Sequence, residues 1–164
     1  MGASESLWAY ATRVYASPPV ARACLRAQDD LGLDVNILLF AAWLADRGYA
    51  LASAQVAAAE ELCSAWRSDV VKPLRRTRRA WREAPPNADA YEAIKGLELE
   101  AERHQLSFLE SLGHRLVGAG PTRDAQAIEE QSYDLLRGNL VLAAGLFESR
   151  SFLDDLVSAL KAVD

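Results

Sequence analysis

The sequence feature that most restricts the fold is an uninterrupted run of nine apolar residues from Ile37 to Ala45. Asp34 stands before this run in a position suited to a helix N-cap, and Gly48 follows it as a helix terminator. Asn36 is the one polar residue near the start of the segment, so a helix formed here has no face suited to solvent. We therefore expect residues 34–47 to form the central helix of a bundle.

A membrane span is not indicated, because nine apolar residues are fewer than the roughly 20 that a helix needs to cross a bilayer. The N-terminal residues MGASESLWAY lack the basic and apolar regions of a secretory signal. Cys24 and Cys63 form no CxxC motif, so they predict neither a disulfide framework nor a zinc site. These features favour a cytoplasmic protein without a transmembrane segment.

The rest of the sequence predicts an all-α fold. Ala, Leu, Glu and Arg are frequent, and no segment alternates apolar and polar residues over the length of a strand. A chain of 164 residues suits one domain, so we expect residues 1–164 to form a single irregular bundle. Prolines, glycines and capping residues divide it into about six to seven helices, near residues 5–16, 19–31, 34–47, 53–84, 89–117, 122–147 and 151–163.

The predicted helix 53–84 contains Pro73 in its interior. A proline there removes a backbone hydrogen bond and clashes with the preceding turn, which kinks or breaks a helix. The apolar stripe nevertheless keeps helical spacing on both sides of the proline, through Val56, Ala59, Cys63, Trp66, Val70, Leu74, Thr77 and Trp81. Because the phase persists, we predict one helix kinked near Pro73.

The same helix carries a cluster of positive charge. Residues 67–82 hold seven basic side chains and one acidic side chain, although the whole chain has a net charge of −5. One face of the helix collects most of them, opposite the apolar stripe: Lys72, Arg75, Arg76, Arg78, Arg79 and Arg82. The excess of arginine over lysine favours bidentate contacts with carboxylate or phosphate groups.

Two explanations of this basic face are open. Glutamates of the predicted helix 89–117 can neutralise it, or it can dock a partner through Lys72, Arg75, Arg78, Arg79 and Arg82. Docking is favoured, because the face carries more charge than one neighbouring helix can match. An acidic protein is then the preferred partner, ahead of nucleic acid or anionic lipid. Docking predicts that at least two of the last four arginines lack a carboxylate partner within the chain.

Glu98 and Gln105 fall inside the apolar arc of the predicted helix 89–117, two turns apart. A buried carboxylate costs several kcal/mol unless it is paired and hydrogen-bonded. Candidate partners are polar residues that interrupt other apolar patterns, namely Gln28, Asn36 and Asn139. These five residues predict a polar pocket, for a ligand or for fixing helix register, unless Glu98 and Gln105 lie at the edge of the arc and reach water.

No constellation of residues predicts catalysis. The sequence has no Glu-x-x-His pair, no glycine-rich phosphate loop and no arrangement that would activate a nucleophile. Asp29, Asp30 and Asp34 are close in sequence, but a glycine interrupts them and no comparable second motif follows, so capping and ion pairing explain them best. We expect no catalytic residue, no metal site and no cofactor.

Three segments carry a resemblance to known sequences: CLRAQDDLGLDVNILLFAAWLADRG at 24–48, VVKPLRRTRR at 70–79 and LLRGNL at 135–140. They resemble a family of short proteobacterial proteins, conserved hypothetical proteins of unknown function. The resemblance implies a bacterial cytosolic setting and no particular activity. Two hypotheses follow from the residues: a non-enzymatic adaptor that uses the basic helix 67–82, or a small-molecule binder or enzyme with a polar pocket.

Overall fold

The computed structural model describes residues 5–87, 89–119, 125–145 and 150–163. Within these ranges the secondary structure is helical and includes no strand, which confirms the all-α prediction. The helices are α1 (Leu7–Tyr15), α2 (Pro18–Asp29), α3 (Val35–Asp46), α4 (Ser53–Trp66), α5 (Lys72–Glu83), α6 (Ala90–Ala119), α7 (Ala125–Ala143) and α8 (Arg150–Lys161), and the π-helical turn η1 (Arg67–Val71) joins α4 to α5. The limits Thr122 and Phe147 predicted for the sixth helix lie outside the described residues.

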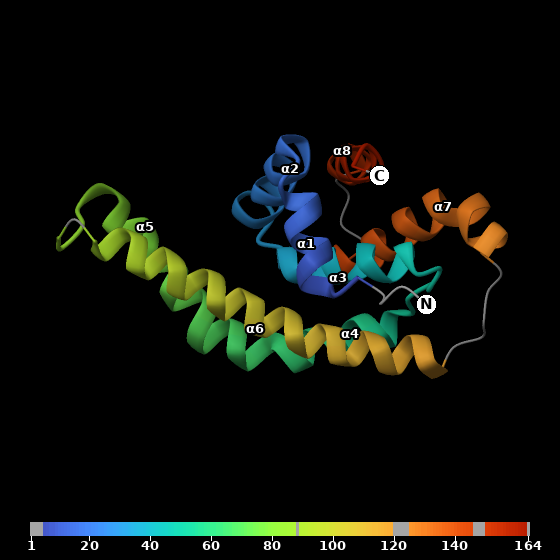
Figure 1. The fold of residues 1–164 in the computed structure, drawn as a ribbon, viewed down its shortest axis with the longest axis horizontal. Coiled ribbons are helices and arrows are strands. Elements are labelled where there is room, and N and C mark those ends of the chain that lie inside the picture. The colour runs from blue at the N-terminus through green and yellow to red at the C-terminus, as the bar shows by residue number, and fades with distance from the viewer. Residues whose placement is uncertain (1–4, 88, 120–124, 146–149, 164) are drawn as a thin grey trace.

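The central helix of the bundle is α3, as the sequence predicts. Asp34 caps it, because its Oδ1 accepts the backbone N–H of Asn36 at 2.9 Å. Every residue from Asn36 to Ala45 is buried, and α1, α2, α4, α6 and α7 all pack against this helix. Gly48 ends the segment with a φ of 71°, which glycine adopts without strain. Figure 1 shows α3 in the middle of the molecule.

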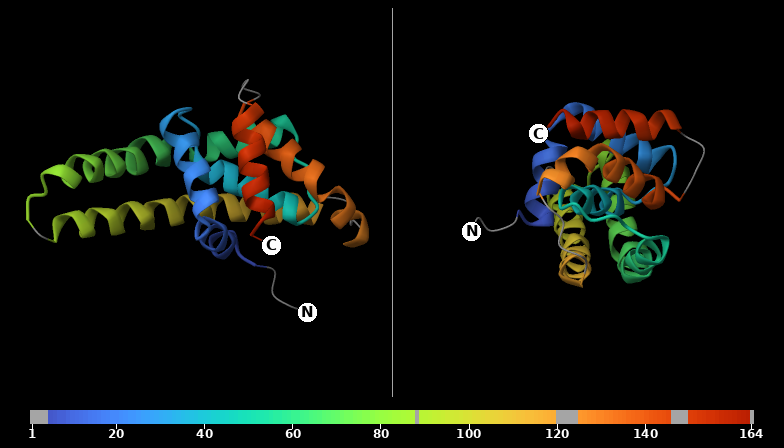
Figure 2. Two further views of the ribbon diagram at one scale, coloured as in Figure 1. Left: turned by 90° about the horizontal axis from the view of Figure 1, so that it is seen from above. Right: turned by 90° about the vertical axis from the view of Figure 1, so that its right-hand side faces the viewer.

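A long antiparallel hairpin is formed by α4, η1 and α5 on one arm and α6 on the other. Figures 1 and 2 show the arms side by side, with the α5 end projecting beyond the other helices. The first arm stays helical from Ser53 to Glu83 without a loop, as predicted. Its irregularity lies in η1, where the N–H of Lys72 donates to the carbonyl of Arg67. This wider turn accommodates Pro73, which lacks an N–H and crowds the preceding turn.

Because of the π-helical turn, the second half of this arm buries a different face from the one predicted. The turn takes up one extra residue, so the following side chains are rotated by about 100° relative to a continuous α-helix. The buried valine is therefore Val71, whereas Val70 is half-buried. Arg75 and Arg78 follow Val71 at helical spacing and contact glutamates of α6. Two arginines of the predicted outer face thus point into the hairpin.

The second arm, α6, packs on two sides, against α4 and α5 and against α1 and α3. Its buried stripe includes Ile94, Glu98, Ala101, Gln105 and Leu109. Leu97, which the helical pattern assigns to the main apolar arc, is 58% exposed. At Gly113 the helix touches α3 so closely that an added Cβ would lie 2.5 Å from Cζ3 of Trp43.

The C-terminal helices complete the bundle, with α7 along α3 and α8 packed on α2 and α7. Asn139 of α7 is buried, and its amide nitrogen donates to the carbonyls of Ala41 at 3.1 Å and Tyr49 at 2.8 Å. Its Oδ1 accepts the N–H of Leu51 at 2.8 Å. This one side chain therefore fixes the connection between α3 and α4. Among the described helices, none combines the length and the apolar composition that crossing a bilayer requires.

Candidate functional site

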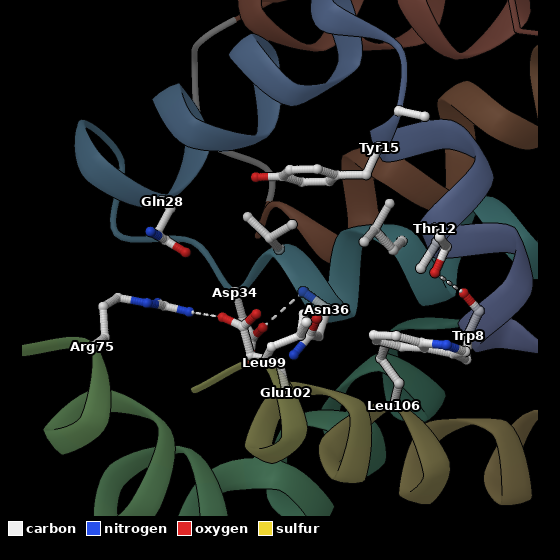
Figure 3. A pocket seen from close by; sticks show the side chains of 14 residues that line it. Trp8, Thr12, Tyr15, Gln28, Asp34, Asn36, Arg75, Leu99, Glu102 and Leu106 are labelled. Atoms are coloured by element: carbon white, nitrogen blue, oxygen red, sulfur yellow. Dashed lines mark hydrogen bonds and ion pairs between the residues drawn. The ribbon is translucent and has the colours of Figure 1, made fainter. Parts of the chain in front are cut away.

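A cavity of about 370 Å³ lies between α1, α3 and α6. Most of its wall is apolar and comes from Trp8, Ala11, Tyr15, Ala16, Val35, Leu39, Leu99 and Leu106. Its polar lining comes from Thr12, Gln28, Asp34, Asn36, Arg75 and Glu102. Figure 3 shows Trp8 and Tyr15 projecting from α1 and Arg75 extending from α5 toward the carboxylates. The cavity is thus apolar with a charged and polar rim.

Asp34 connects the cap of α3 to both arms of the hairpin. Its Oδ2 accepts hydrogen bonds from Arg67 Nη1 at 2.8 Å and from Gln105 Nε2 at 2.7 Å. Arg67 also pairs with Glu60 at 2.7 Å. Because its other oxygen caps α3, the Asp34 carboxylate has donors on both sides and is held in one orientation.

Glu98 is buried where α6 faces α5, and it bridges two arginines. Its Oε1 accepts from Nε of Arg75 at 3.0 Å, and its Oε2 accepts from Nε of Arg78. Arg75 also donates to Glu102, one turn further along α6. Burial lowers the pKa of the Arg75 guanidinium, but the two glutamates outweigh burial and hold this pKa above its ordinary value. The network keeps Arg75 charged and in place at the cavity rim.

Glu102 has a different environment from Glu98, because it lines the cavity and its side chain is 27% exposed. Its Oε1 accepts from Arg75, and no donor in the described part of the chain reaches its Oε2. Burial raises the pKa of the Glu102 carboxyl, and the charge of Arg75 opposes this rise. One oxygen of a partly buried carboxylate is therefore available to a ligand.

A second cavity of about 320 Å³ adjoins the first and shares with it Gln28, Asp34, Asn36 and Arg75. Arg67, Val71 and Gln105 contribute to its lining. Gln105 is 1% exposed, and its Oε1 has no hydrogen-bond partner among the described residues. A buried acceptor without a donor costs free energy, so Gln105 carries an unsatisfied oxygen that is closed to solvent.

The predicted pocket residues are only partly brought together. Gln28 and Asn36 line both cavities, Gln105 lines the second, and Glu98 lies behind Arg75 and lines neither. Both Glu98 and Gln105 are buried, as predicted, and Gln105 bonds to the cap residue of the third helix. The partners of Glu98 are arginines, and not the expected amides, because α5 covers this part of α6. Asn139 lines neither cavity and holds the α3–α4 connection instead.

The residues of the predicted basic face also differ from one another in their surroundings. Three of its arginines pair with carboxylates of the chain, Arg75 and Arg78 with Glu98 and Arg79 with Asp29. In the described part of the chain, no carboxylate pairs with Lys72, Arg76 or Arg82. The expectation that at least two of Arg75, Arg78, Arg79 and Arg82 are unpaired is therefore wrong. A helical wheel shows only how residues are arranged around one helix axis. It does not show which neighbouring helices, here α6 and α2, supply carboxylate partners for the arginines.

Sequence reasoning did not select Trp8, Tyr15 or Glu102 as site residues. The spacing of seven between Trp8 and Tyr15 is the available signal, because it puts both aromatic rings on one face of α1. Partial burial raises the pKa of Tyr15 to about 12, so its hydroxyl stays protonated at neutral pH. Across the described residues, no three His, Cys, Asp or Glu side chains converge in a way that could hold a metal ion.

The chain is similar to known sequences at the level of a family model. No curated protein and no solved structure matches the chain. A family model described as Protein of unknown function (DUF2390) matches residues 6–109. This span runs from the cap of α1 into α6 and contains every residue that lines the two cavities. Because the match covers more than half of the sequence, the chain belongs to the DUF2390 family.

Proposed function

We propose that this protein binds a small molecule in the cavity between α1, α3 and α6. The observation that carries the proposal is an apolar cavity of about 370 Å³ with a fixed charged rim. Binding sites for small molecules are typically apolar clefts of roughly 300–1,000 Å³ with a few convergent polar groups. The apolar wall would contribute affinity, and the rim would select the orientation of the ligand.

The rim is ordered by bonds within the chain, which also supports a binding site. Asp34 is fixed by Arg67 and Gln105, and Arg75 is fixed by Glu98 and Glu102. A site whose polar groups are already oriented loses less conformational entropy when a ligand binds. Burying these ion pairs costs desolvation free energy. Their role in positioning the polar groups of the site would explain why the fold contains them.

The test uses two leucines of α6 that differ in their relation to the cavity. Leu99 lines it and is 50% exposed, whereas Leu97 is 58% exposed and does not line it. A library of small amines, acids and neutral compounds is screened for compounds that raise the Tm of the protein. Leu99→Trp fills the rim and should abolish the shift, and Leu97→Trp should retain it. The proposal is wrong if no compound raises the Tm, or if Leu99→Trp binds as well as the unchanged protein.

Docking of an acidic protein segment is a second candidate function. It is supported by the three basic residues on the α5 arm that have no carboxylate partner among the described residues: Lys72, Arg76 and Arg82. Reversing all three charges should leave the Tm nearly unchanged and abolish binding of an acidic peptide. Exposed charges are screened over about 10 Å at 0.1 M salt, so this binding should also weaken as salt rises. Retained binding by the triple variant would exclude this surface.

A further inference from the structure

The charges on the cavity wall restrict the chemical class of its ligand. The wall has two carboxylates, Asp34 and Glu102, and one guanidinium, Arg75, so it carries a net negative charge. Glu98, directly behind Arg75, adds a further carboxylate to this surrounding. Arg67 pairs with Asp34 and Arg78 pairs with Glu98, so these two carboxylates are already balanced and Glu102 is the carboxylate of the wall that shares its arginine with another acid.

The hydrogen bonds show which of these charges is open. Asp34 accepts from the N–H of Asn36 and from two side chains, so both of its oxygens are already used. Arg75 donates to Glu98 through Nε and to Glu102 through Nη2, so two carboxylates already face its positive charge, although its Nη1 has no acceptor among the described residues. Oε2 of Glu102 is the charged atom of the wall without a donor among the described residues.

The aromatic residues of the wall favour the same sign of charge. Trp8 and Tyr15 both line the cavity, and the faces of indole and phenol rings attract cations. Trp8 already shows this preference, because the guanidinium carbon of Arg103 lies 5.2 Å from its ring centroid. A positively charged group near Glu102 would thus be attracted by the carboxylate and by neighbouring rings.

We propose that the ligand is an amine with an apolar body, whose ammonium group donates to Oε2 of Glu102. The apolar body would lie against Leu39, Leu99 and Leu106, with Trp8 and Tyr15 beside it. The ammonium group supplies the donor that this oxygen lacks, and it lowers the net negative charge of the wall. This inference rests on the proposed small-molecule function and adds the class of ligand to it.

The experiment compares three probes that share one apolar body: phenylbutylamine, phenylbutanol and phenylbutyric acid. Their affinities for the full chain are measured by isothermal titration calorimetry at neutral pH. The amine should bind more tightly than the alcohol by about tenfold, which is the effect of one partly exposed charge-assisted contact. The acid should bind more weakly than the alcohol, because its carboxylate would lie beside the like charge of Glu102.

Two variants of α6 assign the effect to one residue. Glu102→Gln keeps an acceptor for Arg75 and should remove the advantage of the amine, so that amine and alcohol bind this variant with equal affinity. Glu100→Gln is the matched control, because Glu100 is an exposed glutamate of the same helix that lines neither cavity. It should leave all three affinities unchanged. If Glu102→Gln does not fold, the ranking of the three probes on the unchanged chain decides the question.

The outcomes separate the ligand class from the proposed function. Equal binding of amine and alcohol, or tighter binding of the acid, overturns the amine proposal and leaves a cavity that binds small molecules. An amine advantage that survives in a folded Glu102→Gln protein overturns the role of Glu102. If the three probes do not bind although other compounds of the library do, the amine class is wrong. If nothing binds, the proposed function itself fails.

Discussion

Replacing Glu98 by alanine tests the packing of α5 against α6 directly. Glu98→Ala removes the carboxylate that Arg75 and Arg78 share. Breaking a buried ion pair by removing one partner costs about 3–5 kcal/mol. Arg75 keeps Glu102, and the two arginine side chains are 20% and 25% exposed, so part of this cost is recovered. We expect the free energy of unfolding to fall by about 2–3 kcal/mol, which for a chain of this size lowers the Tm by about 5–10 °C.

Urea unfolding followed by circular dichroism measures this loss, with Glu100→Ala as the control. Glu100 lies on the same helix, but its side chain is 68% exposed and its nearest cationic atom, on Arg103, is 3.8 Å away. Its replacement should cost less than about 0.5 kcal/mol. Glu98→Gln retains an acceptor and should give an intermediate value. Small and equal losses for the two alanine variants would refute the buried network.

Three further predictions concern other parts of the core. Gly113→Ala should lower stability by about 1–3 kcal/mol, because its Cβ would lie 2.5 Å from Trp43. Gly96→Ala, with nothing within 4 Å, should instead raise the Tm, and the same sign for both would contradict the packing. Asn139→Ala removes the partner of the Leu51 N–H and of the Tyr49 carbonyl, whereas the Ala41 carbonyl still accepts within α3. The substitution should cost about 2–3 kcal/mol in urea unfolding, and a loss below about 0.5 kcal/mol would show that the α3–α4 connection does not need it. Burial raises the pKa of both cysteine thiols to about 12, so a thiol reagent at neutral pH should label them only after unfolding, and rapid native labelling would contradict their burial.

The sequence predicts the helices well where a helix end has its own chemical signal. Asp34 and Gly48 bound an apolar segment, and the structure caps and terminates α3 at these positions. The prediction of continuous helix across Pro73 is correct, although the π-helical turn shifts the buried face by one residue and the predicted apolar phase does not persist. Burial of Glu98 and Gln105 is also predictable from their place in the apolar arc of α6.

The partners of these polar residues are not predictable in the same way. A helical pattern fixes the direction of a side chain about its own axis, but the neighbour is set by tertiary packing. The π-helical turn then rotates Arg75 and Arg78 toward α6. No spacing pattern in the sequence predicts the extra residue that this turn contains. The cavity has a similar origin, because Ala11 of α1 and Ala16, which follows α1, fill less space than larger residues would opposite α3 and α6.

The burial of α3 on all sides has a consequence for the order in which the protein is made. α7, which covers part of α3, is separated from it by about 80 residues of sequence. At 5–20 residues per second, the ribosome completes that interval roughly 4–16 s after it has finished α3. During this time the most apolar helix of the chain lacks part of its cover, so the nascent protein must shield it through α1, α2, α4 and α6 or through a chaperone. Expression rate and chaperone supply should therefore affect the yield of folded protein.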